Sequence, residues 1–177
     1  DLLYGLLLAS GNDAALALAD AAAGSADAFA AKMNEKAAAL GMCSTHFTNP
    51  SGLHDPGHYS SARDLAILMA SAMQNATFAQ ITGTREAVLT GRTVVNHNKL
   101  LHRVPGVDGG KTGFTKAAGR CLVTTAARNG RRLIAVTLNA PDDWRDHEAL
   151  YAYGFSRYSA CVLTLDQTAL PALPLAG

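Results

Sequence analysis

The sequence predicts an α+β fold in which a helical subdomain lies beside an antiparallel sheet. Residues 1–82 are rich in alanine and have apolar residues at helical spacing, which favours packed helices. Two β-rich runs, Arg120–Ala127 and Arg132–Leu138, flank Asn129-Gly130, a sequence typical of a type I′ hairpin turn. Because a two-stranded sheet is not stable alone, we expect further strands or a covering helix to complete it.

Composition and charge exclude several classes of protein. Apolar residues make up 49% of the 177 residues, which is enough for a buried core and excludes a disordered chain. The net charge of +1 offers no electrostatic basis for binding nucleic acid or an anionic membrane. The longest apolar run, Leu2–Ala9, is far shorter than the roughly 20 residues of a membrane span.

The helical part, expected to span residues 1–82, begins with leucines on one face of a first helix at Leu2, Leu3, Leu6 and Leu7. Ser25 and Ser61 are expected N-caps, and Gly24 and Gly41 expected helix ends. The further predicted helices are Asn12–Ala23, Ser25–Gly41 and Leu65–Gln74. Between the last two, the polar stretch Cys43–Ser60 is predicted to be a long ordered loop, a kind of segment that often has a function.

The second part, residues 83–158, is predicted to contain the strands. Glu86–Thr90 and Thr93–Asn96 resemble a small hairpin, and Leu100–Gly110 is expected to be a loop. A last helix is expected after Ala140–Asp143, with Trp144, His147, Leu150, Tyr151 and Phe155 at helical spacing. Residues 159–177 are expected to be a linker or the start of a C-terminal domain.

No metal site is predicted. The three cysteines, Cys43, Cys121 and Cys161, are too far apart for a zinc knuckle or a disulfide scaffold. His54 and His58 are separated by Pro56-Gly57, so they cannot share one helical face as paired zinc ligands do. We therefore interpret the histidines as hydrogen-bonded parts of the loop, and Asp142, Asp143 and Asp146 as partners of a helix N-terminus.

Two short motifs are the candidates for chemistry. Ser10-Gly11-Asn12 lies between two predicted helices, and Lys111-Thr112-Gly113 lies at the start of the β-rich part. Alone, the first is more often a helix cap and the second a solvated turn. In this order they match the second and third signatures of penicillin-binding proteins and class A β-lactamases.

The longer runs around these motifs resemble the low-molecular-mass D-alanyl-D-alanine carboxypeptidases, the peptidase S11 family of serine hydrolases. The resemblance extends over residues 1–158 and includes SGNDAALALADAAAGSADAFAAKMN, ALGMCSTHFTNPSGLHDPGHYSSARDLA and VDGGKTGFTKAAGRCL. It implies a β-lactamase/transpeptidase-like fold. It also implies that the chain is a fragment lacking the N-terminal strands and the nucleophile helix, since the chain opens at Asp1 within a helical pattern.

The resemblance implies catalytic roles for three residues. Ser10 would relay a proton towards the leaving group, and Asn12 would orient a lysine or the substrate amide. Lys111 would add a positive field that lowers the pKa of the nucleophile. The nucleophile itself belongs to an S-x-x-K motif, which lies upstream in this family. None of the serines in these 177 residues has a lysine three positions later, so we expect the chain alone to be inactive.

The same resemblance implies a substrate-binding strand. Thr112 would hydrogen-bond the substrate carboxylate, and Gly113 would let a peptide backbone approach closely. The N–H of Phe114 would complete an oxyanion hole. Some relatives bind the carboxylate with arginines at positions occupied here by His97 and by the segment Leu138–Asp142.

Carboxylate recognition is therefore expected to depend on Thr112, Lys111 and Thr115. The implied activity is removal of the terminal D-Ala from peptidoglycan stem pentapeptides through an acyl-enzyme, without metal or organic cofactor. The expected partners are the stem peptide and, as inhibitors, β-lactams, with no nucleic acid. The expected location is extracytoplasmic, and any membrane anchor is expected outside this fragment.

Two alternatives stay open. A non-catalytic peptidoglycan-binding homologue would lack the nucleophile altogether. A β-lactamase of the same fold is disfavoured because the sequence shows no glutamate-bearing loop of the kind that deacylates in class A enzymes.

Overall fold

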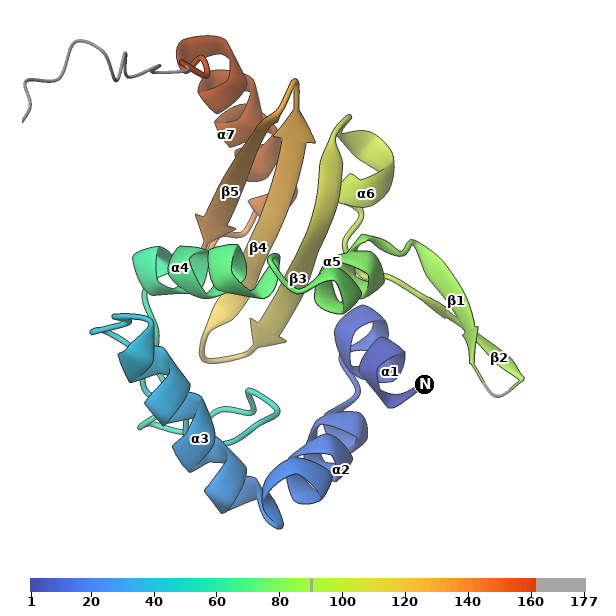
Figure 1. Cartoon of the computed structure of the whole chain (residues 1–177), viewed down its shortest axis with the longest axis vertical. Coiled ribbons are helices and arrows are strands. Elements are labelled where there is room, and N and C mark those ends of the chain that lie inside the picture. The colour runs from blue at the N-terminus through green and yellow to red at the C-terminus, as the bar shows by residue number, and fades with distance from the viewer. Residues whose placement is uncertain (90, 162–177) are drawn as a thin grey trace, which may run out of the picture.

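A computed structural model of the chain describes residues 1–89 and 91–161 (Figure 1). Its helices are α1 (Leu2–Ala9), α2 (Asn12–Ala23), α3 (Ala26–Ala39), α4 (Ala62–Ala72), α5 (Ala76–Gly83), α6 (Leu100–Arg103) and α7 (Asp143–Arg157). Its strands are β1 (Glu86–Leu89), β2 (Arg92–Val95), β3 (Val107–Thr115), β4 (Gly119–Arg128) and β5 (Arg131–Thr137). The predicted combination of a helical part and antiparallel strands is confirmed.

The main sheet is antiparallel, with the order β3-β4-β5. Asn129 and Gly130 join β4 to β5 with φ values of 50° and 74°, the positive values that a type I′ turn requires at both central positions. Helices cover both faces of this sheet: α4 and α5 lie on one face, and α6 and α7 lie on the other (Figure 1). The predicted covering helix is therefore present, together with a third strand.

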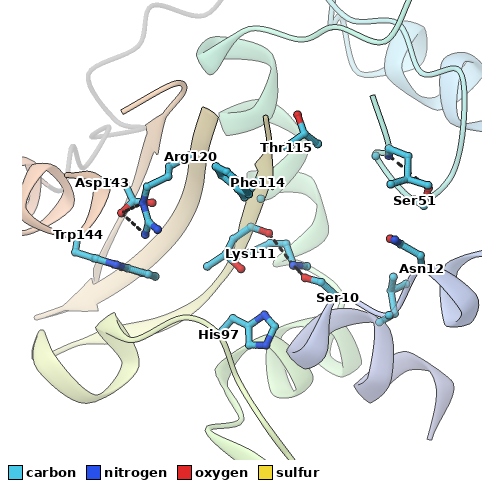
Figure 2. A pocket seen from close by; sticks show the side chains of 16 residues that line it. Ser10, Asn12, Ser51, His97, Lys111, Phe114, Thr115, Arg120, Asp143 and Trp144 are labelled. Carbon is cyan, nitrogen blue, oxygen red and sulfur yellow. Dashed lines mark hydrogen bonds and ion pairs between the residues drawn. The ribbon is translucent and has the colours of Figure 1, made fainter. Parts of the chain in front are cut away.

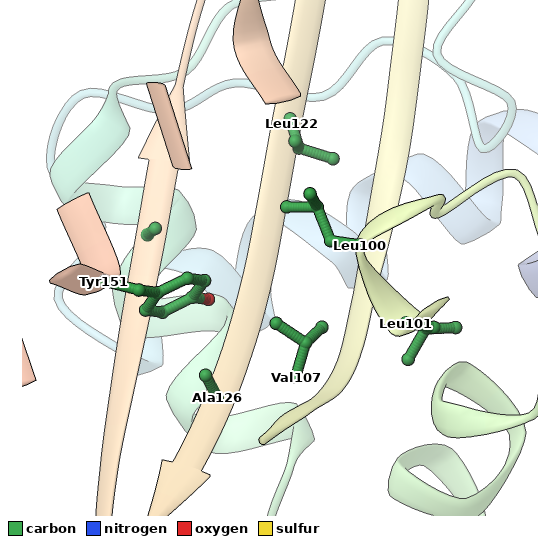
Figure 3. Packing of buried hydrophobic residues seen from close by; sticks show 7 residues of the cluster. Leu100, Leu101, Val107, Leu122, Ala126 and Tyr151 are labelled. Carbon is green, nitrogen blue, oxygen red and sulfur yellow. The ribbon is translucent and has the colours of Figure 1, made fainter. Parts of the chain in front are cut away.

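The largest apolar core lies between the sheet and α7 (Figure 3). Leu122 and Ala126 of β4 point to this face because side chains alternate along a strand. They pack against Tyr151 of α7 and Leu100 of α6, which are both almost fully buried. This core fixes the position of α7, and with it the start of α7 beside the end of β3.

A polar network lies within this core. The imidazole of His147 is completely buried and has Thr124 Oγ1 2.7 Å from Nδ1 and Thr137 Oγ1 3.1 Å from Nε2. Thr124 Oγ1 is also 2.7 Å from the hydroxyl of Tyr151. Burial lowers the pKa of His147 to about 4, although the nearby carboxylates of Asp143 and Asp146 raise it. The histidine is therefore neutral in the folded protein at neutral pH.

We expect His147 to make the fold sensitive to acid. Between pH 6.5 and pH 4 the unfolded chain binds a proton at His147 and the folded chain does not, so stability falls as the pH drops through this window. The shift corresponds to about 3 kcal/mol. Urea denaturation at pH 7 and pH 4.5 should show a smaller loss of stability for His147→Gln than for the parent chain. The control is His54→Gln, because His54 is exposed, and it should behave like the parent. Equal losses in the parent and His147→Gln would contradict the expectation.

The expectation of a loop over Leu100–Gly110 is wrong. Leu100–Arg103 forms the short helix α6, and β3 begins at Val107, so Lys111 is in the middle of a strand and not at its start. The Gly109-Gly110 pair has little intrinsic β propensity, which conceals the strand in the sequence. A Cβ on Gly110 would lie 2.5 Å from the carbonyl oxygen of Val123, so close pairing with β4 requires glycine there.

Most of the individual helices in residues 1–82 begin and end close to their predicted positions. Ser25 and Ser61 are N-caps whose side chains accept hydrogen bonds from Ala28 N and Asp64 N. Helix α4 begins at Ala62, three residues before its predicted start, and α5 was not predicted as a separate helix. Helix α5 begins where Asn75 accepts a hydrogen bond from Phe78 N.

The predicted small hairpin is present as β1 and β2, which extend away from the main sheet (Figure 1). Thr90 lies outside the described residues, as do residues 162–177 of the segment 159–177 that was predicted to be a linker or the start of a C-terminal domain. Among the described helices, no single one is long and apolar enough to cross a membrane. Helices α2 and α3 together have the length and apolar composition of a span, but the chain bends by 81° between them.

Candidate active site

A cleft of about 550 Å³ lies between the helical part and the end of the main sheet (Figure 2). It is bounded by the α1–α2 junction, the loop tip at Ser51–Leu53, the second half of β3, and the start of α7. All seven residues that the sequence singled out line it: Ser10, Asn12, Lys111, Thr112, Gly113, Phe114 and Thr115. The fold therefore brings two motifs that are distant in sequence to one place.

Ser10 is presented to the cleft by the end of α1. It has a φ of 54°, an uncommon value for a residue other than glycine, and its N–H donates to Leu6 O at 3.1 Å. Helix α1 is fixed by Leu8, which is fully buried in a cluster with Ile81 of α5 and Val94 of β2. Such unusual backbone values concentrate at functional sites.

Lys111 extends from β3 towards Ser10. Its ammonium donates to Ser10 Oγ, 101 positions away in the sequence, and to its neighbour's carbonyl oxygen, Thr112 O, at 2.7 Å. Because Ser10 Oγ accepts this bond, the serine hydroxyl can direct its own proton elsewhere in the cleft. Burial lowers the pKa of Lys111 from 10.5 to about 8, so the group is charged at pH 7 but close to its titration range.

We expect the lowered pKa of Lys111 to be visible as early reactivity. Only a neutral amine is acylated by acetic anhydride, so labelling of Lys111 in the folded chain should reach half its maximum near pH 8. Peptide mass spectrometry measures the extent at each pH. In the urea-unfolded chain the midpoint should move towards 10.5, the ordinary value for lysine. A folded midpoint as high as the unfolded one would show that the ammonium is not desolvated.

The remaining predicted residues in the cleft differ in how far their side chains are already bonded within the protein. The side chain of Asn12 forms no hydrogen bond to Lys111 or to any other residue that the structure describes, so its amide can meet a ligand. The ring of Phe114 is 71% exposed. Thr115 Oγ1 already accepts a hydrogen bond from Ala118 N at 3.0 Å. A Cβ on Gly113 would meet only the Cβ of Cys121, at 3.7 Å, so the protein's own packing does not require glycine there.

The polar stretch predicted as an ordered loop forms one wall of the cleft. Asn49 organises its tip: Oδ1 accepts from Gly52 N at 2.7 Å, and Nδ2 donates to Leu53 O at 2.9 Å. His58 also serves the loop, since its Nδ1 accepts from Thr48 N at 3.2 Å. This agrees with the prediction for His58; for His54, which is exposed and has no hydrogen bond within the described residues, the prediction of a hydrogen-bonded role is wrong. Within the described residues, no group of three or more His, Cys, Asp or Glu side chains could hold a metal ion.

Sequence reasoning noted His97 but did not place it in the cleft. Its neighbours Asn96 and Asn98 are buried and bond to the backbone, with Asn96 Nδ2 donating to Thr84 O and Asn98 Nδ2 to Gly109 O. His97 between them is exposed and lines the cleft. The alternation of asparagine, histidine and asparagine was the available signal.

Sequence reasoning also missed a charged corner of the cleft formed by Arg120, Asp143 and Trp144 (Figure 2). Arg120 Nε and Nη2 donate to Asp143 Oδ1 at 3.1 and 2.8 Å, and the guanidinium lies 5.5 Å from the ring centre of Trp144. The aspartates here were predicted to serve only the helix start. Asp142 is the N-cap without a side-chain cap hydrogen bond, whereas Asp143 pairs with Arg120. No local pattern relates residue 120 to residue 143.

Comparison with known proteins decides the family. The sequence model described as D-alanyl-D-alanine carboxypeptidase, peptidase S11, matches residues 1–142. The chain belongs to the peptidase S11 family. A D-alanyl-D-alanine carboxypeptidase of Mycobacterium tuberculosis is 46% identical over 167 residues, covering 88% of this chain and 57% of that protein. One from Bacillus subtilis is 43% identical over 145 residues, covering 79% of this chain and 37% of that protein. This S11 chain thus spans about half the length, or less, of these relatives.

Solved structures of similar proteins confirm the transpeptidase-like fold. A putative penicillin-binding protein homologue from M. tuberculosis superposes with a TM-score of 0.84 at 44% identity, covering 93% of this chain and 67% of that one. The Streptomyces K15 DD-transpeptidase gives a TM-score of 0.84 at 36% identity, covering 88% and 66%. Penicillin-binding protein D2 of Listeria monocytogenes, in its ampicillin-bound form, gives a TM-score of 0.80 at 37% identity. The match covers 88% of this chain and 66% of that one. The predicted boundaries of the two parts of this S11 chain stay a prediction.

Proposed function

We propose that this chain supplies the proton-relay and substrate-binding parts of a serine D-alanyl-D-alanine carboxypeptidase that removes the terminal D-Ala from peptidoglycan stem pentapeptides. The observation that supports it most directly is the contact of Lys111 with Ser10 across the cleft, within an S11 fold. Acyl transfer needs a relay and an electrostatic group within hydrogen-bond reach of each other. These two residues provide that pair.

The positions of the cleft residues support the role that we propose for each. Ser10 receives a hydrogen bond from Lys111 and passes its own proton to the leaving amine. Asn12, whose amide has both a donor and an acceptor end, binds the substrate amide. β3 is an edge strand of the described sheet, so its free backbone groups can pair with an extended peptide. Thr112 contributes a hydroxyl at this edge, and the N–H of Phe114 serves the oxyanion hole.

The nucleophile is the part of the reaction that these residues do not provide. Since no S-x-x-K occurs in the 177 residues, we propose that the chain is inactive by itself and needs that motif from another segment. β-Lactams are proposed as covalent inhibitors of the complete site; the Listeria homologue, for which ampicillin- and cefotaxime-bound forms are known, supports this. Peptidoglycan as substrate places the protein outside the cytoplasmic membrane.

The test is to complete the site. An N-terminal segment that carries an S-x-x-K motif, taken from an S11 relative, is fused to this chain, and release of D-Ala from diacetyl-L-Lys-D-Ala-D-Ala is measured. The fusion should release D-Ala, and changing the serine of the fused motif to alanine should abolish the release. A folded fusion that neither releases D-Ala nor is acylated by penicillin would overturn the proposal and favour a non-catalytic homologue.

The β-lactamase alternative is distinguished in the same experiment by the fate of penicillin. No glutamate lines the cleft in the described part of the chain, so the structure offers no group of the class A kind to activate a deacylating water. The penicilloyl adduct of the fusion should therefore be long-lived. Rapid turnover of penicillin by the fusion would favour the β-lactamase reading.

A further inference from the structure

The cleft contains two cationic side chains, Lys111 and Arg120, which lie in different parts of it and have different partners. The described residues that line the cleft include two basic side chains, Lys111 and Arg120, and one carboxylic side chain, Asp143. The ammonium of Lys111 is occupied by Ser10 Oγ and by Thr112 O. It therefore faces the relay serine, and the opposite end of the cleft is left to Arg120 (Figure 2).

The strand register places Arg120 beside the substrate strand. Arg120 of β4 is paired with Phe114 of β3, and Leu122 is paired with Thr112. Paired residues of an antiparallel sheet project from the same face, so Arg120, Phe114 and Thr112 share one face at this end of the sheet. A guanidinium reaches a diagonal neighbour on the same face, which brings Arg120 and the Thr112 hydroxyl within range of a single ligand group.

The Arg120 side chain is held in place by Asp143, and part of its guanidinium remains free to bind a ligand. Both of its contacts with Asp143 go to Oδ1, and they occupy two of the five N–H groups of a guanidinium. The other three have no acceptor among the residues that the structure describes. The Asp143 side chain is only 3% exposed, whereas that of Arg120 is 40% exposed. The buried carboxylate thus anchors one edge of the guanidinium and leaves the other to the cleft.

We propose that Arg120 binds the terminal carboxylate of the peptide substrate, together with the Thr112 hydroxyl. This inference rests on the proposed function and names the group that recognises the free C-terminus in it. A planar guanidinium with adjacent N–H groups fits a carboxylate in a bidentate manner, which a lysine cannot do. The assignment adds Arg120 to the expected carboxylate ligands: two of the three ammonium N–H groups of Lys111 are used within the protein, whereas three of the five guanidinium N–H groups of Arg120 are free.

The experiment compares two peptides that differ only at the C-terminus. Diacetyl-L-Lys-D-Ala-D-Ala and its C-terminal amide are titrated into the 177-residue chain, and chemical-shift changes give millimolar dissociation constants. The parent should bind the acid about tenfold more tightly than the amide, as expected for a charge-assisted hydrogen bond. Arg120→Gln should lose this preference and bind the amide as the parent does. Arg120→Lys, which keeps a cation beside Asp143, should retain part of the preference.

The control variant is Lys116→Gln, which makes the same change of charge at an exposed residue near the same turn and should keep the full preference. The amide spectrum of each variant confirms its fold. Equal binding of acid and amide by the parent, or an undiminished preference in both Arg120 variants, would overturn the role of Arg120 while leaving the proposed function intact. A folded parent chain that binds neither peptide would overturn the proposed function itself, and the role of Arg120 with it.

Discussion

The 177-residue chain alone should form no covalent adduct with a fluorescent penicillin. Acylation needs an activated serine, and the chain has no serine with a lysine three positions later. Lys111 contacts Ser10, but its ammonium donates a hydrogen bond to the serine oxygen and cannot accept the serine proton. This arrangement suits a proton relay, whereas a nucleophilic serine needs a base beside it. Gel fluorescence after incubation measures labelling, and the expected stoichiometry is zero against one per molecule for the completed fusion.

The completed fusion serves as the positive control for this result. Stoichiometric, hydroxylamine-sensitive labelling of the isolated chain would contradict the expectation. If Ser10→Ala then removed that label, Ser10 would be the attacking residue, and the relay role proposed for it would be wrong.

Replacing Lys111 in the fusion should reduce D-Ala release by a factor on the order of 10²–10³, the usual cost of losing one preorganised electrostatic group. Lys111→Ala removes a charge that is half-buried beside Ser10, where water screens it poorly. Lys116→Ala should have almost no effect, because that side chain is exposed beyond the end of β3. Steady-state release from the pentapeptide, measured for both variants at matched folding, compares the two.

The pH profile gives a second readout for Lys111. If its charge is required, kcat/KM of the fusion should decline as the pH rises through about 8, where the ammonium loses its proton. The residual rate of Lys111→Ala should not show that decline. Equal losses for the two lysine variants, or a larger loss for Lys116→Ala, would show that the wrong lysine has been placed in the site.

Local signals in the sequence correctly predicted the features that depend on neighbouring residues. Ser25 and Ser61 cap helices because their hydroxyls reach N–H groups three positions away. Asn129-Gly130 forms the hairpin turn because both residues tolerate positive φ. The order of the two motifs, read together with the surrounding runs, was sufficient to predict the family.

The strand β3 was predicted poorly because its first half has little propensity of its own. Val107–Gly110 becomes a strand since β4 lies beside it and Asn98 binds Gly109 O. Propensity is weak evidence where tertiary pairing supplies the hydrogen bonds. For the same reason the sequence placed Lys111 at the start of the strand, although it is in the middle.

By itself the sequence determined the helical and β-rich parts, the hairpin turn and the residues of the two motifs. Only the tertiary structure decided that Ser10 and Lys111 touch, and that Arg120, Asp143 and Trp144 form the far corner of the cleft. The physical reason is that strand register and helix packing set these distances. Phe114 faces Arg120 because of the β3–β4 pairing, and Asp143 reaches Arg120 because the core under β4 fixes α7. No local pattern encodes either contact.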